Sequence, residues 1–186
     1  LVEWATDEEF TLGVGQSEPQ GVAPGVDQVS VTLRPTGFLP GARYYGRILV
    51  ENGVGEGQSE VFVFTMPVAL PGGETGQPTG GGGGDGETVL PGRVDPGGGE
   101  TRYRFQISPT PDFTEFREIE GGVLPPGNTI QDVQVPAGVL EPGTFYCVRI
   151  VTTNEAGETF GDPVCFTTPG PPPPPSAPGV TTLAPT

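Results

Sequence analysis

The chain contains one pattern twice, first as Phe38-Leu-Pro-Gly-Ala-Arg-Tyr-Tyr-Gly-Arg-Ile-Leu-Val-Glu-Asn52 and again, 102 positions later, as Leu140-Glu-Pro-Gly-Thr-Phe-Tyr-Cys-Val-Arg-Ile-Val-Thr-Thr-Asn154. The match continues without a gap to Phe64-Thr65 and Phe166-Thr167. In both copies, apolar residues alternate with other residues at the period of a β-strand. A repeat of this length indicates a duplicated module, so we expect a function that arrays of such modules perform.

The first copy is shorter at its start than the second. Shifted by one residue, the same comparison pairs Trp4 to Phe10 with Ile107 to Phe113. The second copy already has strand-like sequence before this point, up to Arg104, whereas the first begins here. We therefore expect the first copy to lack its opening strands.

Size and composition predict small all-β modules. A chain of 186 residues with an internal offset of 102 fits two domains with modest cores. The 32 Gly and 24 Pro show no Gly-X-Y period, which excludes collagen and favours β modules joined by low-complexity segments. No apolar run is long enough to cross a bilayer, and no signal segment opens the sequence. Because the chain opens on Leu1, we interpret it as a processed product or a piece of a longer protein.

Alternating apolar patterns closed by turn residues predict the strands of each copy. In the second copy these strands are 87–94, 101–107, 129–135, 144–153 and 159–168, with a short one near Phe116. In the first copy they are 1–4, 28–34, 42–51 and 58–66.

Five segments follow from these patterns. We expect a first module at 1–66, a Gly-rich linker at 67–86 that acts as a flexible tether, and a second module at 87–168. The run of prolines at 169–176 predicts a stiff polyproline II spacer that rises about 3.1 Å per residue. The tail 177–186 is β-like again, as the first strand of a next module or a donor strand would be.

The later half of each copy resembles the last two strands of a fibronectin type III domain. The resemblance rests on Leu140-x-Pro-Gly-x-x-Tyr146-x-Val-x-Ile150-x-x-x-Asn154 and a following strand that ends at Phe166, with the first copy keeping this pattern. It implies antiparallel β-sandwich modules of the immunoglobulin-like kind. It also implies that Tyr44 and Tyr146 form tyrosine corners, in which the hydroxyl bonds to a nearby backbone group.

A second resemblance precedes the first in the C-terminal copy. The stretch Val89-Leu-Pro-Gly-Arg-Val-Asp-Pro-Gly-Gly-Gly-Glu-Thr-Arg-Tyr-Arg-Phe105 is similar to the opening of fibronectin-type repeats in secreted and surface proteins of bacteria. The chain departs from the animal pattern because its second strand has no Trp; Trp4 aligns with Ile107. Without an Arg-Gly-Asp sequence, integrin-type adhesion is not supported.

The two cysteines, Cys147 and Cys165, lie on the last two predicted strands of the second copy. Both are out of phase with the inward residues of those strands, so we expect them to face outward on neighbouring strands. The first copy has Tyr45 and Val63 at the matching positions, so the cysteines are gained or lost as a pair. A disulfide is therefore favoured over two free thiols, and it would place the protein in an oxidising, extracellular compartment.

Charge and residue inventory exclude several function classes. The net charge of −15, with Arg as the sole basic residue type, argues against nucleic acid and other phosphate-rich partners. The chain has no His and no Lys, so most common catalytic constellations are excluded, and we expect no enzyme, no cofactor and no metal site. Carboxylates cluster at Asp7-Glu8-Glu9 and at Glu115, Glu118 and Glu120, and such groups in loops and edge strands are more often solvated surface.

Two other features have a simpler explanation than a ligand site. The glycines from Gly80 to Gly84 lack the Lys and Ser or Thr of a phosphate-binding loop, so we interpret them as part of the linker. Phe10, Tyr45 and Phe160 could stack on sugar rings of a surface glycan, but aromatic residues at strand period are usually core.

These observations favour a non-catalytic structural protein outside the cell or at its surface, built from modules on Gly- and Pro-rich connectors. Its partners would be copies of itself or neighbouring repeats. The tail residues Val180, Thr181, Thr182 and Leu183 could donate a strand to the incomplete first module of the next copy, which would generate a filament. Truncation is the simpler explanation, in which the tail opens the next repeat of a longer chain. A spacer or weak glycan-binding accessory region of a secreted polysaccharide-degrading enzyme is the alternative function.

Overall fold

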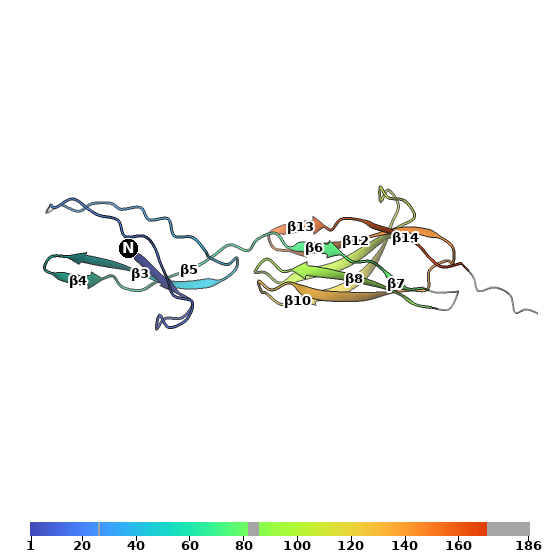
Figure 1. Cartoon of the computed structure of the whole chain (residues 1–186), viewed down its shortest axis with the longest axis horizontal. Coiled ribbons are helices and arrows are strands. Elements are labelled where there is room, and N and C mark those ends of the chain that lie inside the picture. The colour runs from blue at the N-terminus through green and yellow to red at the C-terminus, as the bar shows by residue number, and fades with distance from the viewer. Residues whose placement is uncertain (26, 82–85, 171–186) are drawn as a thin grey trace, which may run out of the picture.

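The computed structural model describes residues 1–25, 27–81 and 86–170, and this part of the chain folds into antiparallel β-strands. It contains no helix, and so none that is long and apolar enough to cross a membrane. Figure 1 shows two groups of strands that lie end to end along the long axis. We call the first group, β1 to β5, the N-terminal module, and the second, β6 to β14, the C-terminal module. The all-β class predicted from the sequence is confirmed.

The N-terminal module is a single sheet. Its order is β2-β1-β3-β4, and β5 also pairs with β3. The long strand β3 turns back into β4 through a two-residue loop, where the side-chain Oδ1 of Asn52 accepts hydrogen bonds from the backbone N of Val54 (2.9 Å) and of Gly55 (3.1 Å). The strands are β1 (Val2–Ala5), β2 (Gly15–Gln16), β3 (Arg43–Asn52), β4 (Gly55–Gln58) and β5 (Phe62–Thr65).

The segment 28–34, which the sequence predicts as a strand, is irregular in the structure. It belongs to a long stretch between β2 and β3 that leaves the sheet and returns to it (Figure 1). Its counterpart in the C-terminal module pairs along its whole length with a neighbouring strand, whereas no described residue pairs with 28–34. A strand needs the backbone hydrogen bonds of a partner, and the described residues supply none to 28–34, whereas β8 supplies them to its counterpart β11.

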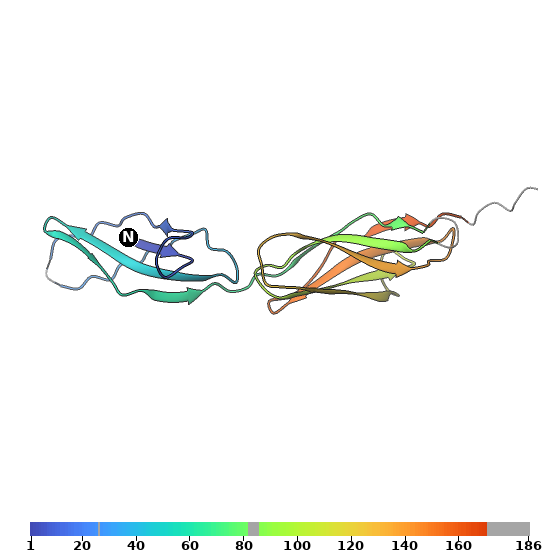
Figure 2. The same ribbon diagram turned by 90° about the horizontal axis from the view of Figure 1, so that it is seen from below.

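The C-terminal module is a sandwich of two sheets (Figure 2). One sheet has the order β10-β9-β12-β13 with β14 also on β12, and the other has the order β11-β8-β6 with β7 also on β8. The strands are β6 (Gly72–Thr75), β7 (Thr79–Gly80), β8 (Thr88–Asp95), β9 (Thr101–Ser108), β10 (Arg117–Leu124), β11 (Gln131–Gly138), β12 (Phe145–Asn154), β13 (Gly157–Phe160) and β14 (Val164–Thr167).

Both sheets of the C-terminal module contribute to one core. Leu90 and Val94 of β8 face Phe105 of β9 and Ile150 of β12, and all four side chains are fully buried. The alternation seen in the sequence places these residues on the inner faces of their strands. The rest of the core consists of Ile107, Val133, Val135, Ala137, Leu140 and Val148.

The range 67–86, for which the sequence predicts a flexible linker, contains two strands. Both β6 and β7 pair with β8, and β6 also touches β12 on the other sheet. Gly73 makes this approach possible because a Cβ there would lie 3.0 Å from the side chain of Ile150. The hydroxyl of Thr75 then accepts a hydrogen bond from the backbone N of Ile150 (3.1 Å). The module therefore starts within the range that composition assigned to a tether.

Candidate functional site

The inner face of the N-terminal sheet corresponds residue by residue to the core face of the C-terminal module. In the first, Val2 is opposite Ile48 and Tyr44 is opposite Phe64. In the second, Phe105 is opposite Ile150 and Tyr146 is opposite Phe166. The two registers match at the sequence offsets found above, so the same side chains point in the same direction in both modules.

Half of this inner face is open in the N-terminal module. Ile48 is 44% exposed and Val50 is 60% exposed, whereas their counterparts Ile150 and Thr152 are fully buried. The difference lies in the cover, because β6 and β8 lie over Ile150 and the N-terminal module has no such strands among its described residues. Exposed apolar side chains gathered on one sheet face are typical of an interaction surface.

The other half of the face is filled by aromatic rings. The Phe38 ring lies 5.2 Å from Trp4, 4.8 Å from Tyr44 and 5.4 Å from Phe64. Gly46 replaces the core residue Val148, and the ring of Phe62 occupies the space that a side chain would take. This cluster buries Tyr44 and lets the sheet keep a partial core of its own.

The two tyrosines that the resemblance singles out behave differently. The hydroxyl of Tyr44 accepts a hydrogen bond from the backbone N of Leu39 (2.9 Å), five residues upstream. Tyr146 is half-buried and packs against Phe166 with ring centroids 6.2 Å apart. Within the described ranges, its hydroxyl makes no hydrogen bond.

The irregular segment 28–34 is a second unpaired feature of the N-terminal module. Val31 is 41% exposed, whereas its counterpart Val133 in β11 is 6% exposed. In the C-terminal module β11 obtains its burial and its backbone hydrogen bonds from β8. The segment thus keeps the alternating pattern of a strand while its cross-strand partner is missing from the described part of the chain.

Ser59 satisfies the backbone amide of Ile48, whose counterpart in the C-terminal module is bound by the second sheet. The backbone N of Ile48 donates to Oγ of Ser59 (2.9 Å), and the backbone N of Ser59 donates to the carbonyl of Ile48 (2.9 Å). In the C-terminal module the corresponding amide, that of Ile150, binds Thr75 of β6 instead, and Gly161 stands where Ser59 does. The Ile48 amide is therefore already satisfied, whereas 28–34, the counterpart of β11, has no partner among the described residues.

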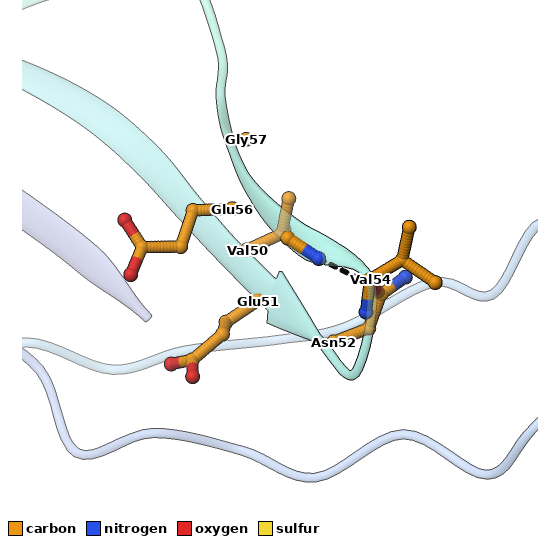
Figure 3. Close-up of a pocket in the computed structure, with 7 residues that line it drawn as sticks. Val50, Glu51, Asn52, Val54, Glu56 and Gly57 are labelled. Atoms are coloured by element: carbon orange, nitrogen blue, oxygen red, sulfur yellow. Dashed lines mark hydrogen bonds between the residues drawn. The ribbon is translucent and has the colours of Figure 1, made fainter.

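The hollow at the end of the open face is formed by the β3–β4 hairpin (Figure 3). Its lining includes Val50 and Val54, and the carboxylates of Glu51 and Glu56 extend to one side of the hairpin. These two glutamates are directly opposite each other in the register of β3 and β4. No cation pairs with either of them among the described residues, so this end of the site is acidic.

Cys147 and Cys165 form a disulfide between β12 and β14, where they are directly opposite each other. Their outward orientation was expected to leave them at the surface, but Cys147 is fully buried. It lies on the central strand β12, flanked by β9 and β14, and the outer face of this sheet carries its own packed side chains. Tyr45 and Val63 take the same opposed positions in the N-terminal module.

That outer packing is an arginine and aromatic arrangement present in both modules. The guanidinium of Arg149 lies over Phe113 (4.3 Å) and Phe160 (4.6 Å), and that of Arg47 lies over Phe10 (4.2 Å). Phe10 and Phe113 share a positive φ, 55° and 53°, which is uncommon outside glycine. The sequence alignment pairs these residues, but sequence reasoning did not identify their contact.

The aromatic rings considered for sugar stacking are engaged by this packing or by a similar contact. Phe10 and Phe160 carry the guanidinium groups just described, and Tyr45 carries that of Arg43 at 5.3 Å. Phe160 is nevertheless half exposed. A ring that binds an arginine on one face keeps at most one face for a ligand.

The acidic clusters serve local structure. Asp7 accepts hydrogen bonds from the backbone N of Thr11 and Leu12 and from the Thr11 hydroxyl, which lower the pKa of this carboxyl. Hydrogen bonds from Gln106 and from Arg104 lower the pKa of Glu118. Carboxylates kept ionised in this way stabilise turns and strand pairs. The other members of the two clusters, Glu8, Glu9, Glu115 and Glu120, are exposed.

Comparison with known proteins assigns no family to the chain. No protein-family model matches the chain, and no curated protein matches it. Among solved structures, the FN1–FN3 domains of chicken CNTN1 are 16% identical with a TM-score of 0.49, and the match covers 92% of this chain and 58% of that one. Domains d3–d4 of the rat CD45 extracellular region are 13% identical with a TM-score of 0.42, covering 89% and 93%.

A third match is the alpha chain of the chicken interferon gamma receptor, at 13% identity and a TM-score of 0.34, covering 68% of this chain and 66% of that one. The chain thus spans 58% of the length of the CNTN1 structure and 66% of the receptor structure. At these identities and TM-scores, the matches show neither a family nor a role for this chain. The immunoglobulin-like sandwich is established independently by the strand order of the C-terminal module.

Proposed function

We propose that this chain is a non-catalytic structural protein of the extracellular space or cell surface, and that its N-terminal module is completed by a strand from another copy. The open face of β3 is the observation that carries the proposal. Ile48 and Val50 are about half exposed at positions that are fully buried in the C-terminal module. Covering such side chains contributes roughly 25 cal/mol for each Å² removed from water.

The strand-donor part of the proposal commits to the tail of a second copy. The tail contains Val180, Thr181, Thr182 and Leu183, which lie outside the described residues, and it follows the predicted spacer 169–176. A polyproline II spacer of eight residues rises about 25 Å, which would keep the tail away from its own module. On the receiving side, the segment 28–34 offers backbone groups and alternating valines without a partner in the described chain. Repeated head to tail, this exchange would produce a filament.

The extracellular placement rests on the disulfide. Disulfides such as Cys147–Cys165 persist in oxidising compartments and are rare in cytosolic proteins. The net charge of −15 suits a solvated protein that does not bind nucleic acid. The absence of His and Lys from the sequence and the local hydrogen bonds of its carboxylate clusters support a role without catalysis.

The experiment compares the whole chain with a chain that ends at Gly170. Sedimentation velocity over a hundredfold concentration range should show growing assemblies for the whole chain and monomers for the shortened one. A synthetic peptide of residues 177–186 should bind the shortened chain and shift the emission of Trp4. Electron microscopy of the assemblies should show filaments.

A matched pair of variants tests where the tail binds. Val31→Asp places a charge on the proposed edge, where the side chain is already exposed, and should abolish assembly and peptide binding. Val123→Asp places the same charge at a site of similar exposure on β10 and should change neither assembly nor peptide binding. Monomers at every concentration, together with no binding of the peptide, would overturn strand donation.

A further inference from the structure

The two modules meet at a contact between two glycine turns. Gly41 follows Pro40 in the loop before β3, and Gly98 lies in the loop between β8 and β9; both have positive φ, 68° and 85°. A Cβ added to Gly41 would overlap the carbonyl oxygen of Gly98, and a Cβ added to Gly98 would overlap that of Pro40. The side chain of Asn128 donates a hydrogen bond to this Pro40 oxygen (3.1 Å). Three loops from two modules thus converge within van der Waals contact.

The connection between the modules is also bonded on both sides. On the N-terminal side, the backbone N of Met66 donates to Ala42 O (2.9 Å), and that of Gly41 donates to Pro67 O (3.1 Å). On the C-terminal side, the backbone N of Ala69 donates to Gly97 O (2.8 Å), and the side chain of Asn154 donates to Ala69 O (2.8 Å). No stretch of the connection is left without contacts, so it does not have the freedom of a tether.

From these contacts we infer that the two modules form a rigid rod with one fixed angle, set by the joint of Gly41, Gly98 and Asn128. The joint goes beyond the proposed function, because a structural spacer has to set the distance between its ends but does not need a fixed angle between its modules. It also does not rest on strand donation, since every group in it belongs to the described residues of one chain. In an assembly, a fixed angle would pass the orientation of one module on to the next.

The repeat supplies a control for this joint. Gly143 is the counterpart of Gly41, with φ of 65° and the same hydrogen bond from its backbone N to a proline carbonyl, that of Pro169 (3.0 Å). Among the described residues, which end at Gly170, a Cβ on Gly143 would find only Gly170, at 4.0 Å. Ala at either position bears the strain of a positive φ, but only Ala at Gly41 also collides with the other module.

The test is single-molecule fluorescence energy transfer on the full chain, with dyes on non-canonical residues at Val54 and Val123, both well exposed. At picomolar concentration the chain is monomeric, even if it associates at higher concentrations. The unmodified chain and Gly143→Ala should give one narrow distribution of transfer efficiency. Gly41→Ala and Gly98→Ala should shift and broaden it. Asn128→Ala, which changes no backbone conformation, should broaden it less.

Two outcomes would overturn the joint. One is a broad distribution in the unmodified chain, as a free tether would give. The other is a narrow, unshifted distribution in Gly98→Ala while its hydrogen-exchange pattern shows both modules folded. If Gly98→Ala fails to fold, Asn128→Ala decides, because an unchanged distribution in that variant would also contradict the joint.

Discussion

Ile48 and Ile150 occupy the same position in the two copies of the repeat, yet one is 44% exposed and the other is fully buried. The local structure around them is alike, since each lies on a ten-residue strand with the same partners on both sides. What differs is the second sheet, which β6, β7, β8 and β11 form in the C-terminal module and which has no counterpart among the described residues of the N-terminal one. The comparison shows that strand sequence sets which face is apolar, whereas burial depends on a sheet contributed by other segments.

The same pair also differs in hydrogen bonding at the edge. The Ile150 amide is satisfied by a strand from the other sheet, through Thr75, whereas the Ile48 amide is satisfied by Ser59 at the end of its own hairpin. The backbone amide of Ile48 therefore has a hydrogen-bond partner within its own sheet. Its open face is apolar surface, which can exist in water before a partner arrives.

The largest expected effect is the contrast between Ile150→Ala and Ile48→Ala. Ile150→Ala should destabilise the C-terminal module by about 2–5 kcal/mol, because it leaves a cavity in a closed core. Ile48→Ala should change the stability of the N-terminal module by less than about 0.5 kcal/mol, because water already reaches the side chain. Denaturant unfolding separates the two, since Trp4 is the sole Trp and reports the N-terminal module, while amide hydrogen exchange reports the C-terminal one.

Concentration provides the control for this contrast. A large effect of Ile48→Ala in dilute monomer would contradict an open face. The same large effect appearing only at concentrations where chains associate would show that a second copy covers Ile48.

The disulfide should give the next largest effect, confined to one module. Replacing both Cys147 and Cys165 by Ala should cost the C-terminal module about 2–4 kcal/mol, the usual value for a bond that closes a loop of this length. Reductant should do the same to the unmodified chain, while the Trp4 transition stays in place. A reductant that shifts neither transition, or shifts that of Trp4 equally, would contradict a stabilising bond in this module.

Much of this fold could be predicted from the sequence because its strands carry strong alternation. The pattern of Tyr146, Val148 and Ile150 marked the inner face of β12, and the repeat transferred that face to β3. The pairing of Cys147 with Cys165 followed from their joint replacement by Tyr45 and Val63. The absence of opening strands from the first module, expected from where its alignment with the second begins, stays a prediction.

The features that could not be predicted depend on contacts between distant segments. Composition around Gly73 suggested a tether, yet the same glycine lets β6 lie against Ile150. Alternation placed Cys147 outward but could not show that its neighbours cover it. The stacking of Arg149 on Phe113 joins a loop to a strand, and no local sequence pattern predicts this contact.

A smaller effect is expected from exchanging Gly161, which follows β13, and Ser59, its counterpart after β4. Gly161→Ser should cost about 1–3 kcal/mol, because a Cβ there would lie 2.8 Å from both Ile150 and the Thr75 hydroxyl and would push β6 away. Ser59→Gly should cost less than about 1 kcal/mol, since the two hydrogen bonds that it removes, from the Ile48 amide and to the Glu60 carbonyl, lie at an exposed site. Hydrogen exchange in residues 72–75 measures the first change; unaltered protection of these amides would show that β6 is not held at this edge.

The smallest effect is a loss of stability of the N-terminal module in acid, which depends on the buried carboxylate of Glu3. Glu3 is 8% exposed; a hydrogen bond from Gln16 (2.8 Å) and the Arg47 guanidinium (2.7 Å) lower its pKa. Since the folded pKa is below the unfolded one, the stabilisation is present above the ordinary pKa of a glutamate and is lost as the pH falls through the folded value. The urea concentration at the midpoint of the Trp4 transition should therefore decrease as the pH is lowered below about 5. In Glu3→Gln the decrease should be smaller, and the part that remains would come from Asp7. Glu118→Gln, which removes an exposed carboxylate from the other module, should leave this profile unchanged, and a profile that Glu3→Gln does not flatten would show that the Glu3 contacts contribute nothing to folding.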